Sequence, residues 1–271
     1  MRFKKINLKH YLMNLLLILN IFIIYSCLQT KHDSIPKAEK GVLNLQNWDF
    51  EKNGVIKLDG EWEFYWGEFL QPTSNPVGET YMRLQPGNEI NYINVPGKWN
   101  DFLFKNQPVG ARGYATYRLK IILPNCISTD CKDLKDRLNL EIKLVEIGTA
   151  YKFWINGVLY SKAGKLGISE DSSQQGFNPK LLALQREDIL ILPDKTRKIE
   201  LIFHISNYFH RSGGIWYSIN LGNYPTLYDQ EKLIWIFDFF LLGSILIIGL
   251  YHLGLYLLRK KDQSPLWFGL N

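Results

Sequence analysis

The sequence predicts an all-β extracytoplasmic sandwich followed by one transmembrane α-helix. Three observations support this fold class. Short segments in which apolar and polar residues alternate fill the middle of the 271-residue chain, as expected for half-buried strands. A long apolar run, residues 233–258, follows them and is succeeded at once by three basic residues. A basic and then apolar leader occupies residues 1–27, in the layout of a secretory signal.

The composition limits the function classes. The net charge of +6 could indicate a nucleic-acid ligand, but much of it flanks the two apolar runs, at Arg2, Lys4, Lys5, Lys9 and residues 259–261. No basic stripe with interleaved aromatic residues occurs between them, so we expect no nucleic-acid binding. No nucleotide-binding, zinc-protease or nucleophile-elbow motif is present. The sequence therefore predicts no catalytic residue, no metal and no cofactor.

The leader allows three outcomes. Residues 1–10 are basic, residues 11–26 are apolar, and the small Ser26 precedes Cys27. The leader is therefore a cleaved signal peptide, a lipoprotein signal cut before a lipidated Cys27, or an uncleaved N-terminal membrane segment. Tyr25 is bulkier than a lipoprotein signal usually carries at that position. All three outcomes place residue 28 outside the cytoplasm, and the polar residues 28–40 are expected to form a tether.

Residues 41–230 are expected to form the sandwich. Period-two alternation or strand-forming composition predicts strands at 54–66, 117–123, 137–144, 151–155, 199–205 and 214–221. Asn156-Gly157 is a typical two-residue hairpin turn, since both positions of that turn need a positive φ. Residues 180–187 are the only segment in this region that could form a short helix.

Two cysteines lie in a polar loop of this region. Cys126 and Cys131 are five residues apart. Outside the cytoplasm they could form a disulfide, and two free thiols are the alternative. Their spacing matches no zinc-site pattern.

The apolar run 233–258 is long enough to cross a bilayer as a helix. The basic residues after it predict that its C-terminal end, and the tail 259–271, lie in the cytoplasm. A buried helix of a soluble protein is the alternative. Asp238 and His252 lie 14 residues apart within the run and so share a helix face, about 21 Å apart along the axis. Ionisable residues at this depth indicate a functional contact with other helices, or side chains that reach the interface.

Loop residues provide the ligand-binding candidates. Sugar-binding sites combine aromatic platforms with polar groups that hold the hydroxyls. Trp99 and Trp216 are predicted at loop edges, whereas Trp62 and Trp154 lie within strand patterns and are expected to be structural. The full candidate set is Trp99, Arg112, Asn207, His210, Arg211 and Trp216. Core packing is the alternative for the tryptophans, and a solvated surface position is the alternative for the charged residues.

Four local patterns occur in a fixed order, namely DGEWEFYW at 59–66, VPGKW at 95–99, GYATYRL at 113–119 and AYKFWING at 150–157. This order resembles the galactose-binding-like jelly-roll domain of β-galactosidases and β-glucuronidases. The resemblance implies a jelly roll that binds carbohydrate. It concerns a non-catalytic domain, so it implies no glycosidase carboxylates.

Two further segments, 205–216 and 249–270, resemble the bacterial seven-transmembrane receptors with diverse intracellular signalling modules. The resemblance implies the inner membrane, a periplasmic sensor and a first transmembrane helix. It also implies six more helices and an output domain as partners, so the chain is expected to be a truncated part of a receptor or a gene remnant. A homodimerisation or protein-docking module is the first alternative function, and a hydrolase-like enzyme is the second.

Overall fold

The computed structural model describes residues 35–72, 81–82, 90–124, 140–185, 188–192, 194 and 196–258. The chain divides into two compact units, 1–35 and 36–271, and the second holds the described strands and helix. The predicted leader and tail lie outside the described residues. The same is true of Cys27, Cys126 and Cys131.

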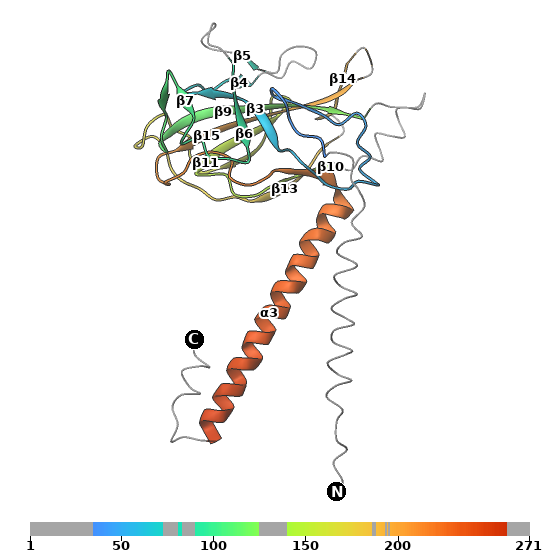
Figure 1. The fold of residues 1–271 in the computed structure, drawn as a ribbon, viewed down its shortest axis with the longest axis vertical. Helices are drawn as coiled ribbons and strands as arrows, with labels where there is room; N and C mark the ends of the chain where they lie inside the picture. The colour runs from blue at the N-terminus through green and yellow to red at the C-terminus, as the bar shows by residue number, and fades with distance from the viewer. Residues whose placement is uncertain are drawn as a thin grey trace. The chain divides into compact units, whose positions relative to one another are not determined.

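Two sheets make up most of the described β structure (Figure 1). The larger one contains β1 Val42–Asn44, β3 Gly60–Trp66, β6 Asn91–Val95, β9 Gly113–Leu123, β11 Ala150–Ile155, β12 Val158–Ala163, β14 Leu190–Ile191 and β15 Arg197–Asn207. Its order is β12-β11-β15-β9-β3-β6, with β1 beside β9 and β14 beside β15.

The smaller sheet contains β2 Ile56–Lys57, β10 Leu140–Leu144, β13 Lys180–Ala183 and β16 Asn220–Asn223, in the order β13-β10-β16-β2. Two short strand pairs complete the described β structure: β4 Gln71–Pro72 with β5 Tyr81–Met82, and β7 Leu103–Phe104 with β8 Gln107–Pro108.

Strands β9 and β15 form the centre of the larger sheet. They pair antiparallel over their whole length, from Arg197 opposite Leu123 to Asn207 opposite Gly113. Alternate residues of both strands are buried in one hydrophobic core, which also takes in Ile142 of β10 and other residues of the smaller sheet. A core shared between two sheets defines a β-sandwich, so the predicted sandwich and the period-two patterns at 117–123 and 199–205 are confirmed.

The Asn156-Gly157 turn joins β11 to β12 as predicted. Asn156 has a φ of 47° and Gly157 a φ of 83°, the positive values that a type I′ hairpin requires. The Asn156 carboxamide also accepts a hydrogen bond from the Glu200 backbone N–H at 2.8 Å. The turn therefore attaches the hairpin to β15 as well as reversing the chain.

Some element predictions were wrong in detail. Residues 180–183 form a strand instead of a helical turn, because they pair with β10 at the edge of the smaller sheet. The predicted strand 54–66 is two strands, β2 and β3, which belong to different sheets. Only residues 220–221 of the predicted strand 214–221 are in β16. Ala38, placed in the tether, is buried in the core.

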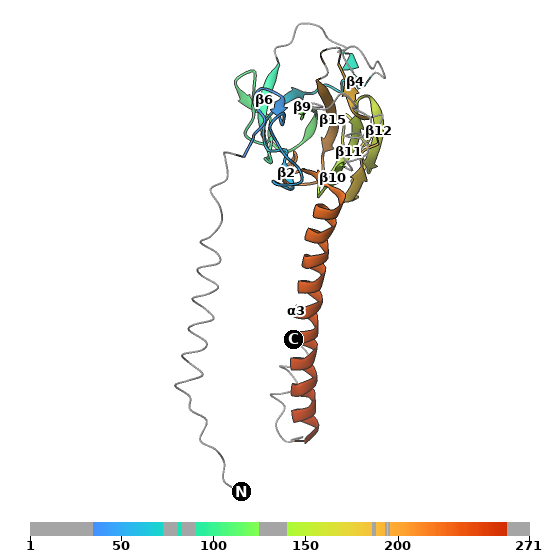
Figure 2. The ribbon, with the colours of Figure 1, turned by 90° about the vertical axis from the view of Figure 1, so that its right-hand side faces the viewer.

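The helix α3, Tyr224–Leu258, follows β16 with no intervening residue. Its first turns contact β10 and β16 (Figures 1 and 2), and Leu227 is buried there. The helix has 35 residues, about 52 Å, which exceeds the hydrocarbon thickness of about 30 Å. By length and composition it can span a membrane, and it begins nine residues before the predicted apolar run, at Tyr224 and not at residue 233.

Candidate ligand site

The six predicted ligand residues come together at one end of the β9–β15 pair. Arg112 directly precedes β9, and Asn207 is the last residue of β15, opposite Gly113. The loop after β15 carries the other C-terminal candidates, and the loop after β6 carries Trp99. We call this set the end cluster: Trp99, Arg112, Asn207, His210, Arg211 and Trp216. The structure thus joins segments that are more than 100 residues apart in the sequence.

Asn207 organises the end cluster from inside. Its side chain is fully buried. Its Nδ2 donates to the carbonyl oxygens of Ala111 and His210, each at 2.8 Å. Its Oδ1 accepts from the His210 N–H at 3.0 Å and from the Thr149 hydroxyl at 3.3 Å. A buried amide with these partners has no capacity left for a ligand. Asn207 therefore positions the two loops and does not face solvent, which corrects its prediction as a contact residue.

Trp99 also belongs to the interior. Its ring is fully buried, and its Nε1 donates to the Ala111 carbonyl at 3.1 Å. A Cβ on Gly213 would lie 2.1 Å from this ring, so the Gly213 backbone packs directly against the indole. The predicted binding platform at Trp99 is consequently wrong, because the 210–216 loop covers the ring.

Trp216 is half-buried and provides the aromatic surface of the end cluster. The exposed His210 ring packs against it, with ring centroids 4.5 Å apart. On another side, the backbone of Gly148 lies so close that a Cβ there would be 2.3 Å from the Trp216 ring. The neighbouring Phe209 and Tyr217 are exposed. Phe209 and Tyr217 were not predicted as ligand candidates. Their positions next to His210 and Trp216 in the sequence could have indicated them.

Both arginines of the end cluster are open to solvent. Arg112 forms a 2.8 Å ion pair with Glu170, whose side chain is 52% exposed against 66% for Arg112. Within the described part of the chain, Arg211 has no acidic partner. Its carbonyl accepts from Asn100 Nδ2 at 3.0 Å, which fixes the backbone but leaves the guanidinium available.

Glu170 comes from a loop to which no sequence pattern pointed. Ser173 of the same loop lies 3.1 Å from Ser206, oxygen to oxygen. Gly167 N–H also donates to the Ser206 hydroxyl at 3.4 Å. The loop is therefore attached to the end of β15 beside Asn207. No local sequence signal links Glu170 to Arg112, because 58 residues separate them.

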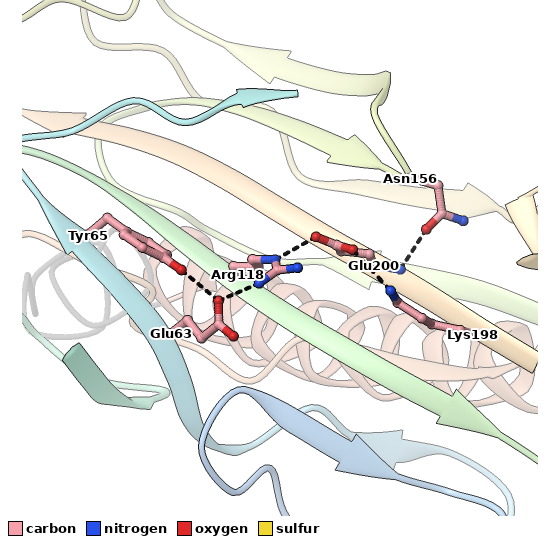
Figure 3. A network of polar contacts seen from close by, with 6 residues as sticks. All are labelled: Glu63, Tyr65, Arg118, Asn156, Lys198 and Glu200. Carbon is pink, nitrogen blue, oxygen red and sulfur yellow. Dashed lines mark hydrogen bonds and ion pairs between the residues drawn. The ribbon is translucent and has the colours of Figure 1, made fainter. Parts of the chain in front are cut away.

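A second polar group, drawn in Figure 3, comes from the sheet residues that alternate with those of the large hydrophobic core. Arg118 of β9 is buried and pairs with Glu63 of β3 at 2.8 Å and with Glu200 of β15 at 2.5 Å. Tyr65 donates to Glu63 at 2.8 Å, and Lys198 lies 3.5 Å from Glu200. The network ties three adjacent strands together.

Electrostatics in this network favour the ion pair. Burial opposes the charged guanidinium, but the hydrogen bonds and charges of Glu200 and Glu63 outweigh it and raise the pKa of Arg118. Burial, followed by repulsion from Arg118, lowers the pKa of Lys120. The carboxylates of Glu63 and Glu200 both contact Arg118 and are shielded from solvent. The three residues therefore have a structural role and do not form an open acid–base site.

His204 lies on the same face of β15, between two aromatic rings. The Phe69 ring stacks on it with centroids 4.8 Å apart, and the Trp154 ring approaches to 4.3 Å. The imidazole is buried, which lowers the pKa of His204 to about 3. His204 is therefore neutral at physiological pH, and no ligand role follows from its position.

The remaining predicted sites are separate from the end cluster. Asp238 is exposed on α3 and His252 half-buried, and no contact joins them. Within the described residues, no group of three or more His, Cys, Asp or Glu side chains is placed to hold a metal ion. An open hollow lies beside β3 and β6, lined by Lys37, Ala38, Glu39, Lys40, Gly60, Glu61 and Asn94.

No known family model matches the chain, and no curated protein matches it. Many solved structures resemble it, and three of them, each aligned with 62% of the chain, are a β-glucuronidase from an uncultured Clostridium sp. (14% identity, TM-score 0.40), a GH2 β-galacturonidase from Eisenbergiella tayi (14%, 0.37) and a β-glucuronidase from Faecalibacterium prausnitzii (16%, 0.38). The chain spans only 28%, 24% and 31% of those proteins, respectively. A likeness this weak identifies no activity.

Proposed function

We propose that the chain is the ligand-sensing and membrane-anchoring portion of a bacterial signal-transduction receptor, with carbohydrate as the ligand. The sandwich is then periplasmic, and α3 crosses the inner membrane with its C-terminal end in the cytoplasm. Asp238 and His252 would face the further helices of such a receptor, which the sequence resemblance implies. The output domain would follow those helices.

The observation that carries the proposal is the direct connection from β16 to α3. Strand β16 is a central strand of the smaller sheet, and the next residue is already helical. Leu227 is buried at the start of the helix, and Thr226 approaches Gly54 closely enough that a Cβ there would lie 3.6 Å from its methyl group. A change in the packing of β16 can therefore shift α3 directly, because no flexible linker separates them.

The end cluster supports carbohydrate as the ligand class. The half-buried Trp216, the exposed His210 and the neighbouring, exposed Tyr217 supply aromatic surface, and the two exposed arginines supply hydrogen-bond donors. Sugars are bound by such combinations, since apolar sugar faces stack on aromatic rings and hydroxyl groups take the polar contacts. A ligand there shifts a receptor only through its different affinity for two conformations.

Two measurements on the full chain in lipid nanodiscs test the proposal. A glycan array identifies a saccharide, and hydrogen exchange then compares residues 224–232 with and without it. We expect binding and a change in exchange, and we expect insertion of two glycines after Asn223 to remove the change while leaving binding intact. Binding without any change would indicate a carbohydrate-binding module without a receptor role, and absence of binding would refute the ligand proposal.

A docking function is the second candidate. Strand β12 pairs only with β11 in the described part of the sheet, and it exposes Val158 and Leu159 at its start. An exposed apolar edge strand can pair with a second chain. Analytical ultracentrifugation of the full chain in detergent distinguishes the two: a dimer that Leu159→Lys abolishes, together with an empty glycan array, favours docking.

A further inference from the structure

One buried amide group holds together the two backbone segments that carry the arginines of the end cluster. Asn207 Nδ2 binds the carbonyl oxygens of Ala111 and His210, which are the residues directly before Arg112 and Arg211. Since each oxygen lies 2.8 Å from the same nitrogen, the two oxygens are no further apart than twice that distance. The backbone segments that carry Arg112 and Arg211 therefore lie close together at one end of the β9–β15 pair.

The Arg112 side chain already binds a carboxylate, that of Glu170. Its carboxylate takes a hydrogen bond from Arg112 at 2.8 Å, while Arg211 has no acidic partner among the described residues. Both members of the Arg112–Glu170 pair are more than half exposed, so the pair is weak and exchangeable. The loops that carry Trp99 and Glu170 also contain two lysines, Lys98 and Lys165, and two aspartates, Asp101 and Asp171.

We infer that the end cluster selects an acidic saccharide, one that carries a carboxylate or sulfate group; this inference rests on the proposed carbohydrate-binding function. The anionic group binds between Arg112 and Arg211 and displaces Glu170. Guanidinium groups bind carboxylates and sulfates through paired hydrogen bonds. The sugar ring packs against Trp216 and Tyr217. Glu170 then acts as an internal competitor that lowers the affinity for acidic ligands and leaves neutral ones unaffected.

The test uses the full chain in nanodiscs of phosphatidylcholine, so that no anionic lipid competes. The probes are matched pairs of oligosaccharides that end in glucuronate or glucose, in galacturonate or galactose, and in a sulfated or an unsulfated sugar. We expect the acidic member of at least one pair to bind about 10- to 100-fold more tightly than its neutral partner, as for a charge-assisted hydrogen bond. Titration calorimetry measures the difference.

Three variants make the result specific. Arg211→Ala should lose the acidic preference, and Glu170→Gln should strengthen binding of the acidic probe by about 2- to 5-fold, the range for an exposed ion pair. Lys57→Ala is the matched control, because it removes one exposed positive charge from the other sheet. Circular dichroism confirms that each variant is folded.

The outcomes separate the two claims. Equal binding of acidic and neutral members, or weaker acidic binding by Glu170→Gln, would overturn the acidic-ligand inference while leaving carbohydrate binding in place. Binding to none of the probes, together with an empty array of neutral and acidic glycans, would overturn the proposed function itself.

Discussion

Replacing Arg118 with methionine is expected to lower the free energy of unfolding by about 3–5 kcal/mol, the usual cost of breaking a buried ion pair. Arg118 is buried between Glu63 and Glu200, so its loss leaves two shielded carboxylates without their shared cation. Lys198 can compensate only in part, since it lies 3.5 Å from Glu200. For a folded region of this size the change corresponds to a fall in Tm of about 6–20 °C.

Urea unfolding of the full chain in nanodiscs, followed by tryptophan fluorescence, measures this change. Arg112→Met is the matched control, and we expect it to cost less than about 1 kcal/mol because its ion pair is exposed. The combined variant Glu63→Gln, Arg118→Met, Glu200→Gln should be more stable than Arg118→Met alone, since it leaves no buried charge unpaired. An Arg118→Met cost below about 1 kcal/mol would refute the assigned role of the network.

Three further predictions concern single residues. Burial lowers the pKa of His204 to about 3 in the folded chain, whereas a histidine in the unfolded chain titrates at about pH 6.5. Between pH 7 and pH 5 only the unfolded chain therefore takes up a proton at this residue, and the free energy of unfolding should drop by about 2 kcal/mol. His204→Phe should flatten that part of the pH profile measured by urea unfolding, and an unchanged slope would contradict the assignment. Gly213→Ala should cost about 1–3 kcal/mol by thermal unfolding, because the new methyl group overlaps the buried Trp99 ring, and a neutral result would mean that the loop yields freely. Leu227→Ala should cost about 2–5 kcal/mol and speed hydrogen exchange at residues 224–232, whereas unaltered exchange would show that Leu227 does not anchor the helix.

Local sequence patterns predicted the secondary-structure elements that depend on neighbouring residues. The alternation in β9 and β15 follows from the one sheet face that packs in the hydrophobic core, since the opposite face is buried but carries polar groups such as Arg118 and Glu200. Asn156-Gly157 forms its turn through the conformational preferences of two residues. The strand at 180–183 could not be predicted in this way, because it exists through pairing with β10. The apolar run predicted the helix, but its start at Tyr224 depends on packing against the sandwich, which the run itself does not encode.

That the six candidate residues bind a ligand stays a prediction, and the structure shows only where each of them lies. Loop position and residue type pointed to six residues that do converge. Whether each side chain is covered depends on a distant segment: the 210–216 loop buries Trp99, although more than 100 residues lie between them. The ion pairs of Arg118 were not predicted, since its partners are 55 and 82 residues away.

The hairpin turn has a consequence for the chemical ageing of the protein. An asparagine followed by glycine is prone to lose its side-chain amide, because the unhindered glycine N–H can attack the carboxamide carbon. Here the Asn156 carboxamide is held at both ends, by the Glu200 N–H and by the Asp188 carbonyl, so the rotation needed for that attack is opposed. Deamidation would place a carboxylate against the Asp188 carbonyl and would loosen β12 from its neighbours. Mass spectrometry of stored protein should therefore find deamidation at Asn156 only after the hairpin has opened.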